Sequence, residues 1–360
     1  MIEKIMSGIK ELDKKAIEIA SIRVDNLAKP LGSLGKLEDI SIKLAGITTK
    51  TYNSVANKCI IIMSSDNGVV EEGVASAPQA ITLEQTKNFI KQKTGVASLS
   101  KVNNTKLIVV DVGINSDEII PGVLNRKISK GTKNIYKEPA MTYNQALTAL
   151  EIGIEAVKIA KDNNFDIIGV GEMGIGNTTT SAAVLKSLLN CSVEDVVGKG
   201  GGITNESFEK KKLVVEQAIK INNLNFNDPI DIVAKVGGYD IVAMAGVYLG
   251  AAYYRIPVVI DGYISVVAAL VANRINPLVK DYCFASHKSE EIGYNLAIKE
   301  LELSPMLDLN MRLGEGSGCP IAFSVIEFAT SMMNNMATFE DVAIDNEYLD
   351  EVRDKECYIV

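Results

Sequence analysis

Two glutamates stand inside glycine-rich stretches, where a carboxylate can meet a ligand with little steric shielding. Glu315 lies in segment 312–320 (RLGEGSGCP), directly before an apolar stretch with helical character. A partly buried carboxylate in such a place is suited to accept a proton from a substrate as a general base. The alternative is an acidic residue in the first turn of a helix, where the helix dipole favours negative charge. The local sequence leaves both interpretations open.

Glu172 lies in segment 166–181 (DIIGVGEMGIGNTTTS), the most distinctive stretch of the chain. A short apolar run leads into four spaced glycines, after which Asn177 and three threonines open a helix. Glycines let the backbone approach a ligand closely, and a helix N-terminus offers free N–H groups to an anion. The segment therefore predicts an anion site. A tight turn from strand to helix, with threonines as capping residues, is the alternative.

The same segment also fits the dinucleotide-binding pattern Gly169-x-Gly171-x-x-Gly174. Glu194 stands about twenty residues further on, where the pattern places an acid that binds a ribose. An NAD(P)-dependent oxidoreductase is therefore the alternative function. Glu172 weighs against it, because a carboxylate inside the loop would repel a pyrophosphate.

Three further loops carry polar groups that chemistry could use. Segment 198–202 (GKGGG) has lysines nearby at positions 199 and 210–212, and a flexible turn beside a solvated helix is its plainer interpretation. In segment 64–79, Asp66 could orient a ligand hydroxyl or cap a turn. Segment 285–290 (ASHKSE) could bind an anion, although a lone histidine, His287, is more often structural.

These loops follow short apolar runs that are typical of buried parallel strands. The runs cover 59–65, 107–112, 166–170, 256–260 and 282–285, and helical stretches at 144–163, 178–190 and 211–222 lie between them. The alternation predicts an α/β fold with a mostly parallel, Rossmann-like sheet flanked by helices. Ligands of such sheets bind at the carboxyl ends of the strands. The polar segment 113–140 is expected to be an irregular excursion.

Two domains are expected from the length and from the distribution of these elements. Residues 46–300 should form a large α/β domain that binds nucleotide and base. Residues 1–45 and 301–360 read mainly as helices and should form a small helical domain that contributes the Glu315 loop. The uncharged run 241–254 is shorter than the roughly 20 apolar residues of a spanning helix. A buried helix, a turn, a strand and another helix are expected over 241–272.

Composition excludes several classes of protein. With 37 Lys and Arg against 45 Asp and Glu, the net charge of −8 argues against a nucleic-acid binder. A single histidine among 360 residues excludes zinc sites with three histidines or an HExxH motif. The five cysteines (59, 191, 283, 319 and 357) are scattered and form no CxxC pair, which is typical of reduced thiols in a cytosolic protein. The N-terminus lacks the apolar region of a signal peptide. A cytoplasmic protein without membrane contact is expected.

Taken in order, seven segments resemble one enzyme family. They are 31–37 (LGSLGKL), 66–79, 171–180 (GEMGIGNTTT), 236–246 (VGGYDIVAMAG), 259–262 (VIDG), 285–290 and 312–318 (RLGEGSG). The family is nicotinate-nucleotide:dimethylbenzimidazole phosphoribosyltransferase. The resemblance covers nearly the whole chain.

The resemblance implies a reaction and roles for the two glutamates. The family transfers the phosphoribosyl group of nicotinate mononucleotide to a benzimidazole nitrogen, inverts the anomeric carbon and releases nicotinate, which gives the α-ribazole 5′-phosphate of cobalamin biosynthesis. Glu315 matches the general base and Glu172 a second acid. No cofactor or metal is implied, because the departing pyridinium carries its own positive charge. A homodimer that acts on small molecules is implied.

The resemblance also assigns binding residues. Those for the nucleotide and its phosphate are Gly174, Gly176, Asn177, Thr178, Thr179, Gly201, Gly202, Lys211 and Ser289. Those for the base are Ser76, Gln79 and Leu313. The sequence departs from the family at Asn67, where a histidine is frequent. Family members also accept purines and phenols, and some work as heteromeric pairs, so the preferred base is left open.

Overall fold

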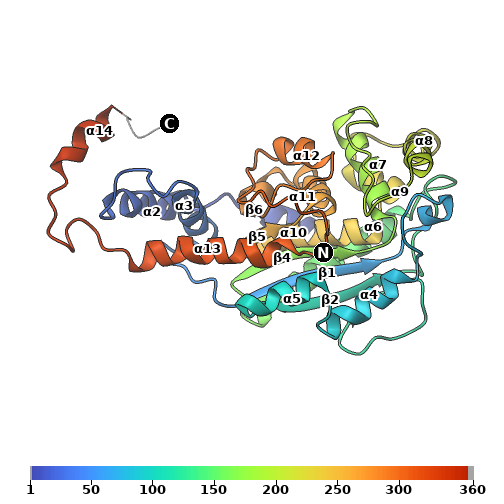
Figure 1. Cartoon of the computed structure of the whole chain (residues 1–360), viewed down its shortest axis with the longest axis horizontal. Coiled ribbons are helices and arrows are strands. Elements are labelled where there is room, and N and C mark those ends of the chain that lie inside the picture. The colour runs from blue at the N-terminus through green and yellow to red at the C-terminus, as the bar shows by residue number, and fades with distance from the viewer. Residues whose placement is uncertain (1, 356–360) are drawn as a thin grey trace. The chain divides into compact units, whose positions relative to one another are not determined.

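A six-stranded parallel sheet forms the centre of the computed structural model, which describes residues 2–355 (Figure 1). The strand order is β3-β2-β1-β4-β5-β6, and every neighbouring pair is parallel. The strands are β1 Lys58–Ser65, β2 Lys106–Gly113, β3 Leu124–Asn125, β4 Ile167–Met173, β5 Val258–Ile260 and β6 Cys283–Ala285. This architecture confirms the α/β prediction.

The central strands are buried on both faces. All eight residues of β1 and all seven of β4 are buried. A sheet covered by helices on both sides requires such continuous apolar runs, and for this reason each of the five expected runs contains a strand. The excursion at 113–140 is irregular as expected, except for the two residues of β3.

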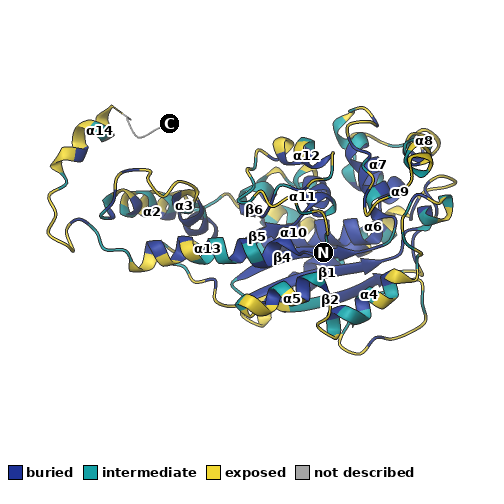
Figure 2. Cartoon of the chain, in the orientation of Figure 1, coloured by how far each residue is buried: buried dark blue, intermediate teal, exposed yellow. Residues whose placement is uncertain are grey.

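Helices cover both faces of the sheet, and Figure 2 shows the burial concentrated in the strands and in the helices against them. Those that lie with the sheet are α1 Ile2–Gly8, α4 Ile81–Ile90, α5 Gly95–Ser100, α6 Tyr143–Asp162, α7 Asn177–Leu189, α8 Asn205–Ile221, α9 Pro229–Val236, α10 Tyr239–Tyr254, α11 Tyr263–Ile275 and α12 Tyr294–Glu300. Glycines bring α6 and α10 together. A Cβ on Gly153 would lie 2.0 Å from the carbonyl oxygen of Ala243, and a Cβ on Gly246 would lie 2.1 Å from that of Leu150.

The apolar region 241–272 folds as the predicted helix, strand and helix, namely α10, β5 and α11. Within residues 2–355, no helix combines the length and the apolar character that crossing a membrane requires. Cys357 lies outside the described residues.

The chain divides into two units. The larger comprises residues 2–10 and Asn57–Ala322, and the smaller comprises Glu11–Ala56 and 323–355. The smaller unit contains α2 Lys14–Asn26, α3 Lys36–Thr48, α14 Asp350–Asp354 and most of α13 Gly318–Asn335, around a core of Ala20, Val24, Leu27, Ala45 and Met333. A buried ion pair joins Lys29 Nζ and Glu38 Oε1 at 2.8 Å.

This division differs from the expected one at three places. Residues 46–56 belong to the smaller unit, although the sequence placed them in the larger one. Residues 2–10 belong with the sheet, because Asn276 Nδ2 donates to the carbonyl of Met6 at 3.0 Å. Segment 301–322, with Glu315, also belongs with the sheet. It has little regular structure before α13, and backbone bonds attach it to the strand ends, including that from Leu307 N to Ser286 O at 3.0 Å.

Candidate active site

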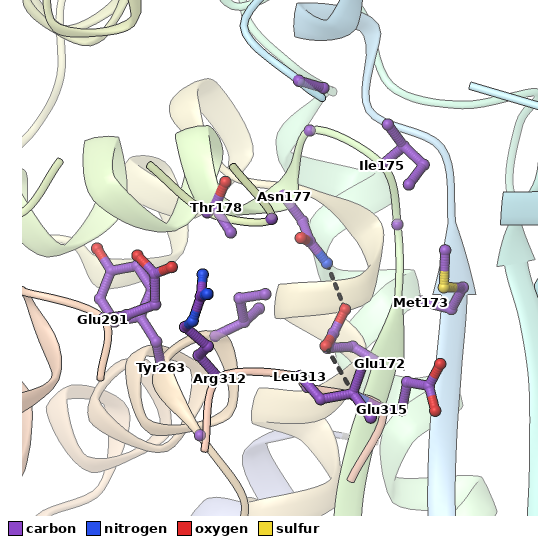
Figure 3. Close-up of a pocket in the computed structure, with 18 of the residues that line it drawn as sticks. Glu172, Met173, Ile175, Asn177, Thr178, Tyr263, Glu291, Arg312, Leu313 and Glu315 are labelled. Carbon is purple, nitrogen blue, oxygen red and sulfur yellow. Dashed lines mark hydrogen bonds between the residues drawn. The ribbon is translucent and has the colours of Figure 1, made fainter. Parts of the chain in front are cut away.

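A cavity of roughly 370 Å³ opens at the carboxyl ends of β4, β5 and β6. Its walls come from the loops after these strands and from segments 74–77, 199–203 and 312–315. The volume lies within the range of small-molecule sites. In Figure 3, Arg312 and Glu291 lie at one side of the cavity, whereas Glu172 and Glu315 lie at the other.

The backbone at Glu315 has an unusual conformation. Its φ of 63° falls in the left-handed region, between Gly314 at 85° and Gly316 at 86°. A non-glycine residue keeps such a conformation only where its surroundings enforce it. Two buried carboxylates do so here. The N–H groups of Gly316 and Gly318 donate to Asp261 at 3.0 and 2.7 Å, and that of Glu315 donates to Glu172 Oε1 at 3.2 Å.

The carboxylate of Glu315 is buried and hydrogen-bonded. Gln85 Nε2 donates to Oε1 at 2.6 Å, and the N–H of Val96 donates to Oε2 at 3.3 Å. Among residues 2–355, no basic side chain forms an ion pair with it. Gln85 lies on α4, outside the glycine-rich motifs, and the sequence analysis missed it.

Glu172 occupies the end of β4 and differs from Glu315 in its surroundings. Burial raises its pKa to about 8, and the negative charges of Asp240 and Asp261 add to this effect. Hydrogen bonds from Asn177 Nδ2 at 2.5 Å and from the N–H of Glu315 oppose it. Burial likewise raises the pKa of Asp240 to about 6 and that of Asp261 to about 7. At neutral pH Glu172 is therefore mainly protonated.

The other side of the cavity offers groups that suit an anion. Helix α7 begins there after Gly176, whose φ is 93°, and Thr178 lines the wall. Arg312, Lys199 and Ser289 also line it, and within the described chain no carboxylate forms an ion pair with Arg312. Burial raises the pKa of Glu291, the acid at this side, and the charges of Lys211 and Arg312 oppose the rise.

The cavity brings together ten of the residues singled out from the sequence. They are Glu315, Glu172, Gly174, Gly176, Asn177, Thr178, Gly201, Ser289, Ser76 and Leu313. It also includes Asp261 and Glu291, for which the sequence analysis named no role. Within residues 2–355, no three His, Cys, Asp or Glu side chains are grouped as metal ligands would be.

Four predicted binding residues lie outside the lining. Thr179 is fully buried in α7, and Gly202 is exposed and does not line the cavity. Lys211 is buried behind the wall, where its Nζ donates to Thr178 Oγ1 at 2.9 Å and to the carbonyl of Gly198 at 3.0 Å. Gln79 accepts a bond from Asn115 at 3.3 Å on the adjacent surface. Their roles in binding stay predictions.

The dinucleotide-like glycines have a structural explanation. Gly169 and Gly171 lie within β4, whereas the dinucleotide motif requires glycines in the turn after the strand. A Cβ on Gly171 would lie 2.5 Å from the carbonyl oxygen of Glu315, and a Cβ on Gly169 would lie 2.7 Å from the Cβ of Cys319. These glycines make room for the Glu315 segment. The oxidoreductase alternative is not supported.

Comparison with known proteins agrees with this geometry. A family model described as phosphoribosyltransferase matches residues 9–344. The nicotinate-nucleotide–dimethylbenzimidazole phosphoribosyltransferase of Clostridium perfringens (strain ATCC 13124) is 72% identical over 360 residues, which cover all of both chains. The chain belongs to this phosphoribosyltransferase family. It is accordingly an enzyme of the pentosyltransferase class.

More distant members of the family preserve the fold. The protein of the same name from Clostridium acetobutylicum is 50% identical over 344 residues, which are 96% of this chain and 98% of that protein. The crystal structure of the Thermus thermophilus enzyme superposes with a TM-score of 0.88 at 33% identity. The structural match covers 93% of this chain and 100% of the Thermus thermophilus chain.

Proposed function

We propose that this enzyme transfers the phosphoribosyl group of nicotinate mononucleotide to 5,6-dimethylbenzimidazole or a related lower-ligand base. The products are α-ribazole 5′-phosphate and nicotinate, and the reaction serves cobalamin biosynthesis. The observation that carries the proposal is the placement of Glu315. Its buried carboxylate has no basic partner in the described chain and shares a cavity with the N-terminus of α7 and with Arg312.

In the proposed arrangement the two substrates bind next to each other in the cavity, since a Cβ on Gly201 would lie 3.0 Å from Ser76 Oγ. The phosphate is placed beside Thr178, Gly201 and Ser289, where the helix N-terminus and Arg312 favour negative charge. The base is placed beside Ser76 and Leu313, with its ring N–H directed at Glu315. A benzimidazole needs an apolar wall and one acceptor, and this side provides both.

The reaction follows from this arrangement. Glu315 takes the proton from one ring nitrogen while the other attacks C1′ of the ribose. The bond from C1′ to the pyridinium nitrogen breaks, and its electron pair neutralises that nitrogen. Attack from the face opposite the leaving group inverts the carbon. Glu172, whose pKa burial raises to about 8, can donate a hydrogen bond in its protonated form.

Incubation with nicotinate mononucleotide and dimethylbenzimidazole tests the proposal. Chromatography and mass spectrometry should detect nicotinate and ribazole phosphate in equal amounts. The proton NMR spectrum of the ribazole phosphate should show the α anomer. Failure with this base and with other azole, purine and phenol acceptors would refute the proposal.

We further infer a cytoplasmic homodimer that acts on small molecules and requires neither membrane nor nucleic acid. The family resemblance supports this inference. Light scattering gives the molar mass of the purified enzyme in solution and so distinguishes a dimer from a monomer. Activity of the purified chain by itself would show that it needs no second, different subunit.

A further inference from the structure

Asp240 is a buried carboxylate that neither the reaction described above nor the cavity lining includes. It lies in the first turn of α10 and is fully inaccessible to solvent. Asn177 Nδ2 donates to Asp240 Oδ2 at 3.0 Å and to Glu172 Oε2 at 2.5 Å. An amide –NH2 group has two hydrogens, so it can make both bonds at once. One amide therefore connects Asp240 to the acid in the cavity.

The glycine motifs around Asp240 leave space for its carboxylate. A Cβ on Gly174 would lie 2.5 Å from Asp240 Oδ2, and a Cβ on Gly238 would lie 2.4 Å from Oδ1. The N–H of Ile241 donates to Oδ1 at 3.0 Å and completes its attachment. Two segments of the family resemblance, around 174 and 238, thus make room for this one side chain.

The charged groups that face this pair are themselves acidic. Asp261 follows β5, and Glu315 lies on segment 312–318. His287 is 3.9 Å from Asp261, and burial lowers its pKa, which favours the neutral imidazole. On the remaining side, the amide of Asn67 approaches Asp240. Across residues 2–355, no lysine, arginine or histidine forms an ion pair with Asp240 or Glu172. Two carboxylates joined in this way cannot both ionise at low cost.

We propose that Asp240 is a positioning residue that orients Glu172 through Asn177, and that its negative charge favours the protonated form of Glu172 at neutral pH. This inference rests on the proposed function, because it gives Glu172 and Glu315 different charges during phosphoribosyl transfer. A neutral Glu172 leaves Glu315 as the proton acceptor. It also avoids repulsion of a substrate that carries a phosphate and a carboxylate.

The test compares pH profiles of kcat/KM for nicotinate mononucleotide in the wild type and in Asp240→Asn. The substitution keeps an oxygen that can accept from Asn177 and removes the charge. Loss of a neighbouring negative charge lowers the pKa of Glu172. The alkaline limb of the profile, where kcat/KM falls as pH rises, should therefore move to lower pH by roughly one unit. A limb that stays in place overturns the proposal.

Asp111→Asn is the matched control. Asp111 is also a buried sheet-end aspartate, it pairs with Lys127 at 3.2 Å, and it lies outside the cavity. Its substitution should lower thermal stability without moving the limb. An equal shift of the alkaline limb in Asp111→Asn also overturns the proposal, because the shift would then follow from a general loss of stability of the fold.

An infrared measurement separates this inference from the proposed function and needs no turnover. Because burial also raises the pKa of Asp261 to about 7, the readout is the difference spectrum between the wild type and Glu172→Gln at pH 7, which should contain the carbonyl stretch of one protonated carboxylic acid. Its titration midpoint should fall in Asp240→Asn. If that variant does not fold, absence of the Glu172-dependent band in the wild type still refutes the inference. If the band behaves as stated but no acceptor is ribosylated, the proposed function fails and the inference about charge stands.

Discussion

The backbone N–H of Glu315 donates to the side chain of Glu172 over 3.2 Å, so two of the acids that line the cavity are directly joined. The bond couples the end of β4 to the segment before α13, which lie far apart in the sequence. One acid thereby helps to hold the other in place. Variants at either position should affect orientation as well as charge.

Glu315→Gln should lower kcat by about a hundred- to ten-thousandfold, the usual contribution of a general base. Binding of the nucleotide, measured by calorimetry, should change little, because glutamine keeps the size of the side chain. Glu194→Gln is the control. Glu194 is exposed and is the residue that the oxidoreductase alternative would need. Wild-type turnover in Glu315→Gln would remove Glu315 from the role of base.

Gln85→Ala should lower kcat by about ten- to a hundredfold, because a hydrogen bond to a charged group contributes about 1.5–3 kcal/mol. The lost bond is the one that orients Glu315 Oε1. Steady-state kinetics should show kcat falling while the KM for the nucleotide stays nearly constant. Glu84→Gln, an exposed change on the same helix, should leave both constants unaltered. An equal loss in both variants would assign the effect to α4 as a whole.

Arg312→Ala should raise the KM for nicotinate mononucleotide by about ten- to a hundredfold, with a smaller effect on kcat. Arg312 lines the anion side of the cavity and has no carboxylate partner there within the described chain. The neighbouring exposed Lys288, which pairs with Asp308, provides the control as Lys288→Ala. An unchanged KM in Arg312→Ala would place the phosphate elsewhere.

Gly171→Ala should destabilise the fold by about 1–3 kcal/mol, the usual cost of an added group in a packed site. The new Cβ would lie 2.5 Å from the carbonyl oxygen of Glu315, so segment 312–318 must move. Urea denaturation and turnover should both register the change. A variant with full stability and activity would show that the close approach is not required.

The buried acids predict a stability that falls as pH rises. The folded-state pKa values of about 8, 7 and 6 for Glu172, Asp261 and Asp240 lie above the ordinary values of 4.5 and 3.8. A raised pKa means that the folded state binds more protons than the unfolded chain. The contribution of these groups to the free energy of unfolding is therefore fully present below about pH 4 and is lost as pH rises towards about 8. Urea denaturation between pH 5 and 8.5 should show this decline, and Asp240→Asn should reduce its slope. A slope equal to that of the wild type would contradict the prediction.

The sequence predicted the sheet well, because a strand buried on both faces is apolar over most of its length, as β1 is from Cys59 to Met63. It singled out Glu315 and Glu172 because each stands in a glycine-rich stretch, and the structure brings both into one cavity. Gln85 was missed because its position on α4 resembles that of any polar helix residue. Only the distance to Glu315 reveals its role.

The boundary of the smaller unit was harder to predict. Segment 301–317 has little regular structure, and its attachment depends on main-chain bonds to Asp261 and Ser286 that leave no periodic pattern. Lys211 shows a related limit. The family resemblance implies a phosphate contact for Lys211, and the structure adds that its Nζ donates to Thr178 Oγ1 and to the carbonyl of Gly198.

The left-handed backbone at Glu315 has a consequence for protein engineering. The direction of this side chain is set by Asp261 on the loop after β5 and by the glycines of β4 that admit the segment. Grafting RLGEGSG onto another parallel sheet would transfer the glutamate without its orientation. A host would also need a glycine at the matching position of one strand and an aspartate at the end of the next.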